Sequence, residues 1–250
     1  MVAITPLPFL PITPSPLQLS RGVMQVVGTR LRVTGREHIP DNMPTVVVSN
    51  HRSVLDAPVL MTGLNRSIAF VCHHYMANVP GLRDLVTQFG AFPLDSPGSR
   101  QRSFFRNAFQ RLRDRDIIGL FPEGAEPMVK LRPPAAISPF QRGVAHLALR
   151  APVDRLAILP VALASADEGF ESLIPLRLLS WFDPHEPLFQ QTGGHPLLVY
   201  RRVEVRIGEP IWVSASERAA YRGRQGSAIA HDLTQQCQRR VQHLLAAPSR

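Results

Sequence analysis

A histidine and an aspartate five residues apart are the first side chains in this sequence that could perform acid–base chemistry. They lie in the stretch Ser-Asn-His-Arg-Ser-Val-Leu-Asp, where His51 and Asp56 follow the apolar run 45–49. A carboxylate that accepts the Nδ1 proton of a histidine leaves Nε2 free to take a proton from a substrate hydroxyl. The pair therefore suggests a general base and the group that orients it.

The same residues also fit a structural role. Asp56 could equally cap a helix that Pro58 helps to begin. Ser53 with Asp56 matches the outline of a capping box, in which the two residues cap a helix reciprocally. On these residues alone, helix capping and catalysis both stay open.

A second carboxylate, Glu123, follows another apolar run, 116–121, in the stretch Phe-Pro-Glu-Gly-Ala. A carboxylate at the end of a strand can hold glycerol hydroxyls or order neighbouring arginines. Its neighbours Pro122 and Gly124 suit an ordinary turn equally well. By itself, this stretch does not choose between a site and a turn.

The elements that must position these residues follow from the hydrophobic pattern. Short apolar runs alternate with amphipathic stretches, as in an α/β domain, and several runs are continuous, as in strands of a buried sheet. The ends of such strands are where α/β sheets bind their ligands. The expected strands are 31–34, 45–49, 68–72, 91–94, 116–121, 156–163 and 197–207. The expected helices are 57–62, 81–89, 100–115, 141–150 and 227–245.

Length and composition indicate one domain. With 250 residues and 44% hydrophobic residues, the chain can bury a single large core. We expect a proline-rich N-terminal arm at 1–20, without a membrane span or signal peptide, and a single domain at 21–250. The segments 122–140 and 164–196 are rich in proline and are expected to be irregular.

The charge and the cysteines limit the partners. The net charge of +9 comes almost wholly from arginine, which suits the phosphates of nucleic acid, lipid or substrate, although a genome that favours arginine codons over lysine codons explains it equally well. Neither zinc-finger spacing nor an aromatic RNA-reading signature is present, so no nucleic acid is expected as a partner. Two cysteines without a CxxC motif fit the reducing cytoplasm. One of them, Cys237, continues the apolar stripe of helix 227–245 and is expected in the core.

Taken together, the motifs resemble those of the glycerolipid acyltransferase family, which contains lysophosphatidate and glycerol-3-phosphate acyltransferases. The Asn-His-x-Ser-x-x-Asp signature of that family matches 50–56 at every specified position, and Phe-Pro-Glu-Gly matches 121–124. A Phe-x-x-Gly-x-x-x-x-Ala stretch at 140–148 and an Ile-Leu-Pro-Val-Ala element at 158–162 follow in the family's order. The resemblance covers about residues 30 to 165.

This resemblance implies an α/β fold with a mixed, largely parallel central sheet flanked by helices. It implies that His51, held by Asp56, removes the proton of an acceptor hydroxyl while that oxygen attacks the acyl thioester. Backbone N–H groups near the turn 122–124, or near the helix start at Asp56, are candidates to stabilise the oxyanion. The residues that it implies for substrate binding are Ser53, Pro122, Glu123 and Gly124.

The sequence departs from the family at two places. Where the family has an arginine after a Gly-x-Phe-like strand, this chain has Ser96, and the nearest arginines are Arg100 and Arg102. We therefore take Arg100 and Arg102 as candidates for the acceptor phosphate, although helix 100–115 also fits ordinary packing over a core. Glu-Gly is followed by Ala-Glu at 125–126, where the family has Thr-Arg.

The resemblance also implies the partners. The donor is acyl-CoA or acyl carrier protein, the acceptor is a lysophospholipid with 1-acylglycerol-3-phosphate as the leading candidate, and no cofactor or metal is required. We expect a peripheral protein on the cytoplasmic face of a membrane. The alternatives are an acyltransferase that acts on another lyso-lipid, a lipid-linked amine or an alcohol, and a non-catalytic lipid- or phosphate-binding protein on the same fold.

Two further segments are open to more than one interpretation. The stretch 173–182, LIPLRLLSWF, suits either a membrane headgroup boundary or a buried element. Cys72 with His73 and His74 could suggest a thiol nucleophile or a metal site. The expectation is that Cys72 points into the core from a strand. The adjacent histidines face different directions, so they are not expected to chelate one ion without further ligands.

Overall fold

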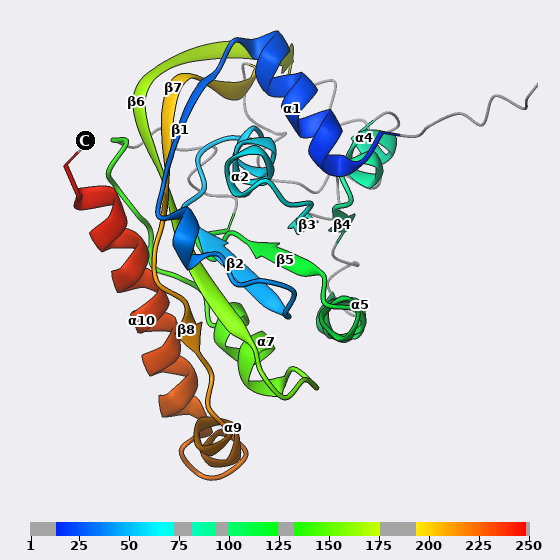
Figure 1. Cartoon of the computed structure of the whole chain (residues 1–250), viewed down its shortest axis with the longest axis vertical. Helices are drawn as coiled ribbons and strands as arrows, with labels where there is room; N and C mark the ends of the chain where they lie inside the picture. The colour runs from blue at the N-terminus through cyan, green and yellow to red at the C-terminus, as the bar shows by residue number, and fades with distance from the viewer. Residues whose placement is uncertain (1–13, 73–81, 94–99, 125–132, 176–193, 249–250) are drawn as a thin grey trace, which may run out of the picture.

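The computed structural model describes residues 14–72, 82–93, 100–124, 133–175 and 194–248. Its centre is a sheet of eight strands among these residues, with the order β1-β7-β6-β2-β5-β3-β4, and β8 pairs with β6 (Figure 1). The strands are β1 (Arg30–Thr34), β2 (Thr45–Ser49), β3 (Ala69–Cys72), β4 (Phe92–Pro93), β5 (Ile117–Leu120), β6 (Ala157–Pro175), β7 (Gly194–Ile207) and β8 (Ile211–Trp212).

Most strand pairs are parallel. The pairs β1·β7, β2·β5, β2·β6, β3·β4 and β3·β5 are parallel, whereas β6 pairs antiparallel with β7 and β8. The prediction of a mixed, largely parallel sheet in an α/β fold is confirmed. The strand β2 is buried at all five positions, because helices cover both faces of the sheet.

Helices cover the sheet as two layers (Figure 1). On one face lie α1 (Pro16–Val27) and α2 (Asp56–Leu64); on the other lie α5 (Arg100–Arg113), α7 (Gly143–Arg150) and α10 (Gly226–Ala246). The remaining helices are the short η1 (Arg36–His38), α4 (Leu82–Gln88) and α9 (Ala215–Tyr221).

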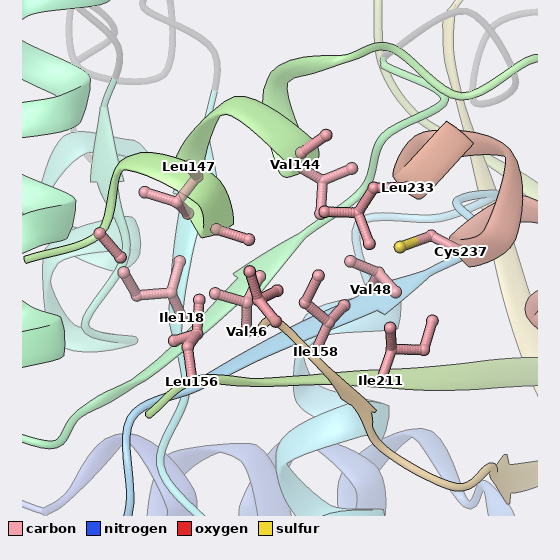
Figure 2. Close-up of a cluster of buried hydrophobic side chains, with 14 of the residues drawn as sticks. Val46, Val48, Ile118, Val144, Leu147, Leu156, Ile158, Ile211, Leu233 and Cys237 are labelled. Carbon is pink, nitrogen blue, oxygen red and sulfur yellow. The ribbon is translucent and has the colours of Figure 1, made fainter. Parts of the chain in front are cut away.

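Each face of the sheet has its own hydrophobic core. Val46 and Val48 of β2 point into the core beneath α7 and α10, whereas Val47 points into the core beneath α2. This alternation is that of a strand with side chains on both faces. Figure 2 shows the first core, where Cys237 of α10 packs near Val48, so the predicted core position of Cys237 is confirmed.

The hairpin of β6 and β7 corrects the sequence prediction for 164–196. That segment was expected to be irregular, but β6 continues to Pro175 and pairs with β7 from Gly194 onward. The acidic and glycine residues around Glu168 interrupt the apolar pattern, and the ladder shifts register there. The two strands form a ribbon, the β6–β7 ribbon, that extends beyond the end of β2 (Figure 1).

Helix α1 begins inside the segment expected to be a proline-rich arm. Pro16 is tolerated because it occupies the first turn, where a helix needs no amide donor. Ser15 and Gln18 form a capping box, and Gly28 ends the helix in the left-handed conformation with φ of 72°. Residues 1–13 of the arm lie outside the described residues.

Helix α5 has the amphipathic face predicted from its sequence. Ala108 and Leu112 are fully buried, and Phe104, Phe105 and Phe109 pack against the same core.

Among the described residues, no helix combines the length and apolar character required to cross a bilayer.

Candidate functional site

The loop between β2 and α2 brings His51 and Asp56 into contact. Nδ1 of His51 lies 2.8 Å from Oδ2 of Asp56, and Asp56 is fully buried. Because an ionised carboxylate can only accept, Nδ1 donates this bond, and in the neutral form of the ring Nε2 holds the lone pair. The His51 side chain retains 12% of its exposure, which keeps the ring accessible from one side.

Asp56 accepts from three further donors. The backbone N–H groups of Arg52 and Ser53 donate to Oδ2 at 2.6 and 2.9 Å, and the hydroxyl of Tyr200 donates to Oδ1 at 2.6 Å. Four donors around one carboxylate fix its orientation.

The helix-capping interpretation is met only in part. The bond from the Ser53 N–H to Asp56 is one half of a capping box, but the Ser53 hydroxyl donates to the carbonyl of Leu198 at 2.6 Å and accepts from Leu55 N–H. The N-cap position of α2 is Leu55, which has no side-chain cap. The Asp56 carboxylate therefore faces the loop and His51 rather than the open end of the helix.

Glu123, in the turn after β5, links the loop that carries His51 to the segment that contains Ser138. Its Oε1 accepts from the backbone N–H of His51 at 2.9 Å and its Oε2 accepts from Ser138 N–H at 2.5 Å. Glu123 is 5% exposed, and burial raises the pKa of its carboxyl despite these hydrogen bonds. The carboxylate thus joins two segments of the chain within the site.

The turn around Glu123 is ordered by its neighbours. Gly124 has a φ of 77°, which an L side chain rarely adopts, and its N–H donates to Phe121 O at 3.0 Å. The carbonyl of Pro122 accepts from Gln141 N–H at 2.8 Å. The turn is fixed on both sides of the carboxylate.

Several candidate oxyanion donors already have partners. The N–H groups of Arg52, Ser53, Asp56 and Gly124 each donate within the loop or the turn. These amides build the site, so an incoming oxyanion would have to compete for them.

An aromatic stack supports the imidazole. The ring of Phe121 lies parallel to that of His51 with centroids 4.0 Å apart, and Phe70 stacks on Phe121 at 5.2 Å. Such stacks restrict the ring planes and exclude water from one face. The orientation of His51 is therefore set by Asp56 at Nδ1 and by Phe121 against its face.

Replacing Gly119 with alanine is expected to disturb this stack. A Cβ at Gly119 would lie 2.2 Å from Cε1 of Phe70, so the Phe70 ring would have to move. Overpacking of this kind costs about 1–3 kcal/mol. Urea unfolding should report the loss, while Gly143→Ala, where a Cβ meets nothing within 4 Å, is the control. Equal stability of both variants would contradict the tight contact.

The β6–β7 ribbon completes the site from the other side. The Asn50 amide bonds both backbone groups of Leu163, at 2.8 and 3.1 Å, and the Arg52 guanidinium forms a two-fold pair with Glu168 at 2.5 and 2.9 Å. Sequence reasoning missed Glu168 and Tyr200, because neither belongs to a motif. Only the fold shows that this ribbon lies beside the loop.

Arg102 lies on α5 and not on the loop or the turn that carries the other candidates. It is exposed near the start of that helix, which packs against β5, the strand next to β2. Arg100 is the first residue of α5, and its side chain lies outside the described residues, as do Ser96 and the pair at 125–126.

Cys72 ends β3 and is partly buried, and burial raises the pKa of its thiol to about 11. The thiolate is the reactive form, so we expect native Cys72 to react with iodoacetamide about 100-fold more slowly at pH 7.5 than in urea. Peptide mass spectrometry measures both rates. Fast native labelling would restore the nucleophile interpretation. His73 and His74 lie outside the described residues, as does most of the stretch 173–182.

Comparison with known proteins places these features in one family. A family model described as Acyltransferase matches residues 30–164, which include the loop and the turn of the site. The chain is 30% identical over 152 residues to 1-acyl-sn-glycerol-3-phosphate acyltransferase alpha of Homo sapiens, covering 59% of this chain and 50% of that protein. It is 27% identical over 184 residues to N-acylphosphatidylethanolamine synthase of Arabidopsis thaliana, covering 69% and 57%.

The chain spans about half the length of the curated relatives it matches. Its fold is similar to the crystal structure of the 1-acyl-sn-glycerophosphate acyltransferase PlsC from Thermotoga maritima, with a TM-score of 0.57 and 20% identity. That likeness covers 94% of this chain and 80% of the other. With the family model matching more than half of its residues, the chain belongs to the acyltransferase family.

Proposed function

We propose that the protein transfers an acyl group from acyl-CoA or acyl carrier protein to a hydroxyl of a lysophospholipid. The leading acceptor is 1-acylglycerol-3-phosphate, which would become phosphatidate. The observation that carries the proposal is the 2.8 Å contact between His51 Nδ1 and the buried carboxylate of Asp56, at the end of β2.

The chemistry follows from that contact. Nε2 of His51 removes the proton of the acceptor hydroxyl while the oxygen attacks the thioester carbonyl. The tetrahedral intermediate collapses, the C–S bond breaks, and the imidazolium returns its proton to the departing thiolate. Asp56 stabilises the imidazolium by its charge, and no covalent intermediate with the protein is needed.

Several effects contribute to the rate acceleration. A positioned general base contributes about 10²- to 10⁴-fold to the rate. Much of the remaining acceleration comes from holding the hydroxyl and the thioester in the attack geometry. The substrates are held by the site residues around His51, with Ser53, Pro122, Glu123 and Gly124 lining the loop and the turn.

Arg102, with Arg100 two residues before it in the sequence, is the proposed contact for the acceptor phosphate. Its exposure leaves the guanidinium accessible to a phosphate, and α5 packs against β5, the strand next to β2. Replacing Arg102 with alanine should therefore raise KM for a phosphorylated acceptor about tenfold with a smaller effect on kcat. An unchanged KM would remove Arg102 from the site.

Peripheral membrane contact, on the cytoplasmic face, is part of the proposal. Val26 of α1 and Leu85 of α4 are exposed apolar side chains, and the two helices lie at the same end of the molecule in Figure 1. Single exposed apolar residues are common, but two on helices at one end suit a lipid surface. Val26→Glu should weaken sedimentation with anionic vesicles, whereas Trp212→Glu, at the distant β8, should not.

The acyl acceptor is the part of the proposal with a second candidate. The similarity to an N-acylphosphatidylethanolamine synthase, over 69% of this chain, favours an amine of phosphatidylethanolamine as the alternative. Both acceptors need a base that removes a proton from the attacking atom.

One experiment tests the reaction class and the acceptor together. Free thiol release from acyl-CoA and from acyl carrier protein is measured with lysophosphatidate, glycerol-3-phosphate, another lysophospholipid or phosphatidylethanolamine, and products are identified by mass. Phosphatidate formed only with lysophosphatidate supports the leading acceptor. An N-acylated product would select the alternative, and binding without release from any donor would favour a non-catalytic lipid-binding protein.

A further inference from the structure

The hydroxyl of Tyr200 reaches the catalytic pair from a distant part of the chain. Tyr200 lies in β7, is 1% exposed, and donates to Oδ1 of Asp56 at 2.6 Å. The family model ends at residue 164, so Tyr200 lies outside the matched region. We propose that Tyr200 is a positioning residue that holds the Asp56 carboxylate in the orientation required by His51, which rests on the proposed function.

The geometry gives each carboxylate oxygen a separate task. Oδ2 receives His51 Nδ1 and the N–H groups of Arg52 and Ser53, whereas Oδ1 receives Tyr200. A carboxylate held at one oxygen only can rotate about its Cβ–Cγ bond, and the imidazole that is bonded to Oδ2 then turns with it away from the orientation required for proton transfer. The Tyr200 hydroxyl blocks that rotation from the opposite side.

The environment keeps Tyr200 a donor. Burial and the neighbouring charge of Asp56 raise the pKa of its hydroxyl well above the ordinary value, so the proton stays on the phenol. Its ring packs in the core beneath α2, where Tyr200 lies with Val203 and Val205 of the same strand. The Tyr200 hydroxyl therefore stays protonated, and the packing of the ring in the core holds it in place.

Several charged groups lie around His51. Asp56 of α2 bonds its Nδ1, Glu123 accepts its backbone N–H, and Arg52 lies next to it in the chain, paired with Glu168 of β6. The Tyr200 bond withdraws electron density from Asp56. Without it, the carboxylate becomes more basic and the imidazolium of His51 is stabilised.

Tyr200→Phe tests this role while keeping the ring. We expect kcat to fall about tenfold with KM changed less than two-fold, because a hydrogen bond to a charged group is lost. The acidic limb of kcat/KM should move to higher pH, since His51 holds its proton more tightly. Tyr221→Phe is the control, because its hydroxyl contacts Nδ1 of His146 at 2.9 Å on α7, away from this site.

A readout without turnover separates this inference from the proposed function. The pKa of His51 is followed by NMR on protein with isotope-labelled histidine, with His51→Gln used for assignment. A raised pKa in Tyr200→Phe, but not in Tyr221→Phe, supports the positioning role even if no donor is consumed. An unchanged pKa, in active or inactive protein, overturns it.

Two further measurements exclude a merely structural effect. In a double-mutant cycle, Tyr200→Phe should have little additional effect on kcat in an Asp56→Asn background, because it acts through that carboxylate. Additive losses would contradict the proposal. If Tyr200→Phe does not fold, replacing the three tyrosines of the chain with 3-fluorotyrosine strengthens the donor, and the pKa of His51 should fall. A constant pKa would then overturn the role.

Discussion

Replacing His51 with alanine is expected to lower kcat about 10²- to 10⁴-fold, the range that a general base contributes. The change removes the Nε2 that we propose as the proton acceptor, while Asp56 keeps its bonds to Arg52, Ser53 and Tyr200. The loop should therefore stay folded. Acceptor-dependent thiol release measures the loss, and thermal unfolding should show a midpoint changed by only a few degrees.

The matched control is His231→Ala, which alters an exposed histidine of α10. It should release thiol at the wild-type rate. A His51→Ala protein that folds and retains full acyl transfer would remove the general-base mechanism. Loss of activity together with loss of the folded signal would be assigned to folding and not to the base.

Replacing Glu123 with alanine is expected to cause the largest loss of stability. It leaves the N–H groups of His51 and Ser138 without their carboxylate acceptor in a buried site. At about 1–3 kcal/mol for each orphaned group, the loss is roughly 2–6 kcal/mol. That is a large fraction of the roughly 5–15 kcal/mol that stabilises a typical domain.

Urea unfolding measures this loss, and Glu209→Ala provides the comparison. Glu209 is exposed and its carboxylate lies 3.8 Å from Arg240, so its removal should cost less than about 1 kcal/mol. Similar losses for the two variants would show that the buried hydrogen bonds of Glu123 do not stabilise the fold.

The Glu123 carboxyl should make the free energy of unfolding depend on pH. Burial raises its pKa in the folded protein, so between its ordinary pKa and the folded pKa the native state binds more protons than the unfolded state. Stability relative to Glu123→Gln is therefore highest at low pH and falls as pH rises through the folded pKa. Urea titrations from pH 4 to 8 measure the difference, and a difference that grows with pH would contradict this sign.

The strands and helices near the motifs were predictable because their patterns are local. The continuous valines of β2 identify a buried strand, and the spacing of Phe105, Ala108 and Leu112 identifies the packed face of α5. The contact between His51 and Asp56 was predictable too, because both residues lie in one short loop. In these places the sequence neighbours are also the spatial neighbours.

The ribbon and its side chains could not be predicted in this way. Polar residues near Glu168 mask the strand, and the register shifts there break the alternation that identifies a hairpin. Tyr200 lies 144 residues from Asp56, so no spacing rule connects them. Helix α9 is a different case, because Ser214 and Glu217 form a capping box that is visible in the sequence.

The pairing of β1 with β7 has a consequence for how the chain folds during synthesis. Arg30 lies opposite Arg202 in that ladder. Strand β1 is therefore synthesised early but cannot pair until β7, the last of the long strands to be synthesised, has been made. Contacts between such distant segments raise the contact order, which slows folding. The loop with His51 likewise receives Tyr200 only at that late stage. We therefore expect a nascent chain that stops near residue 165 to carry every motif of the family match and still lack β7, the strand that joins β1 to the rest of the sheet.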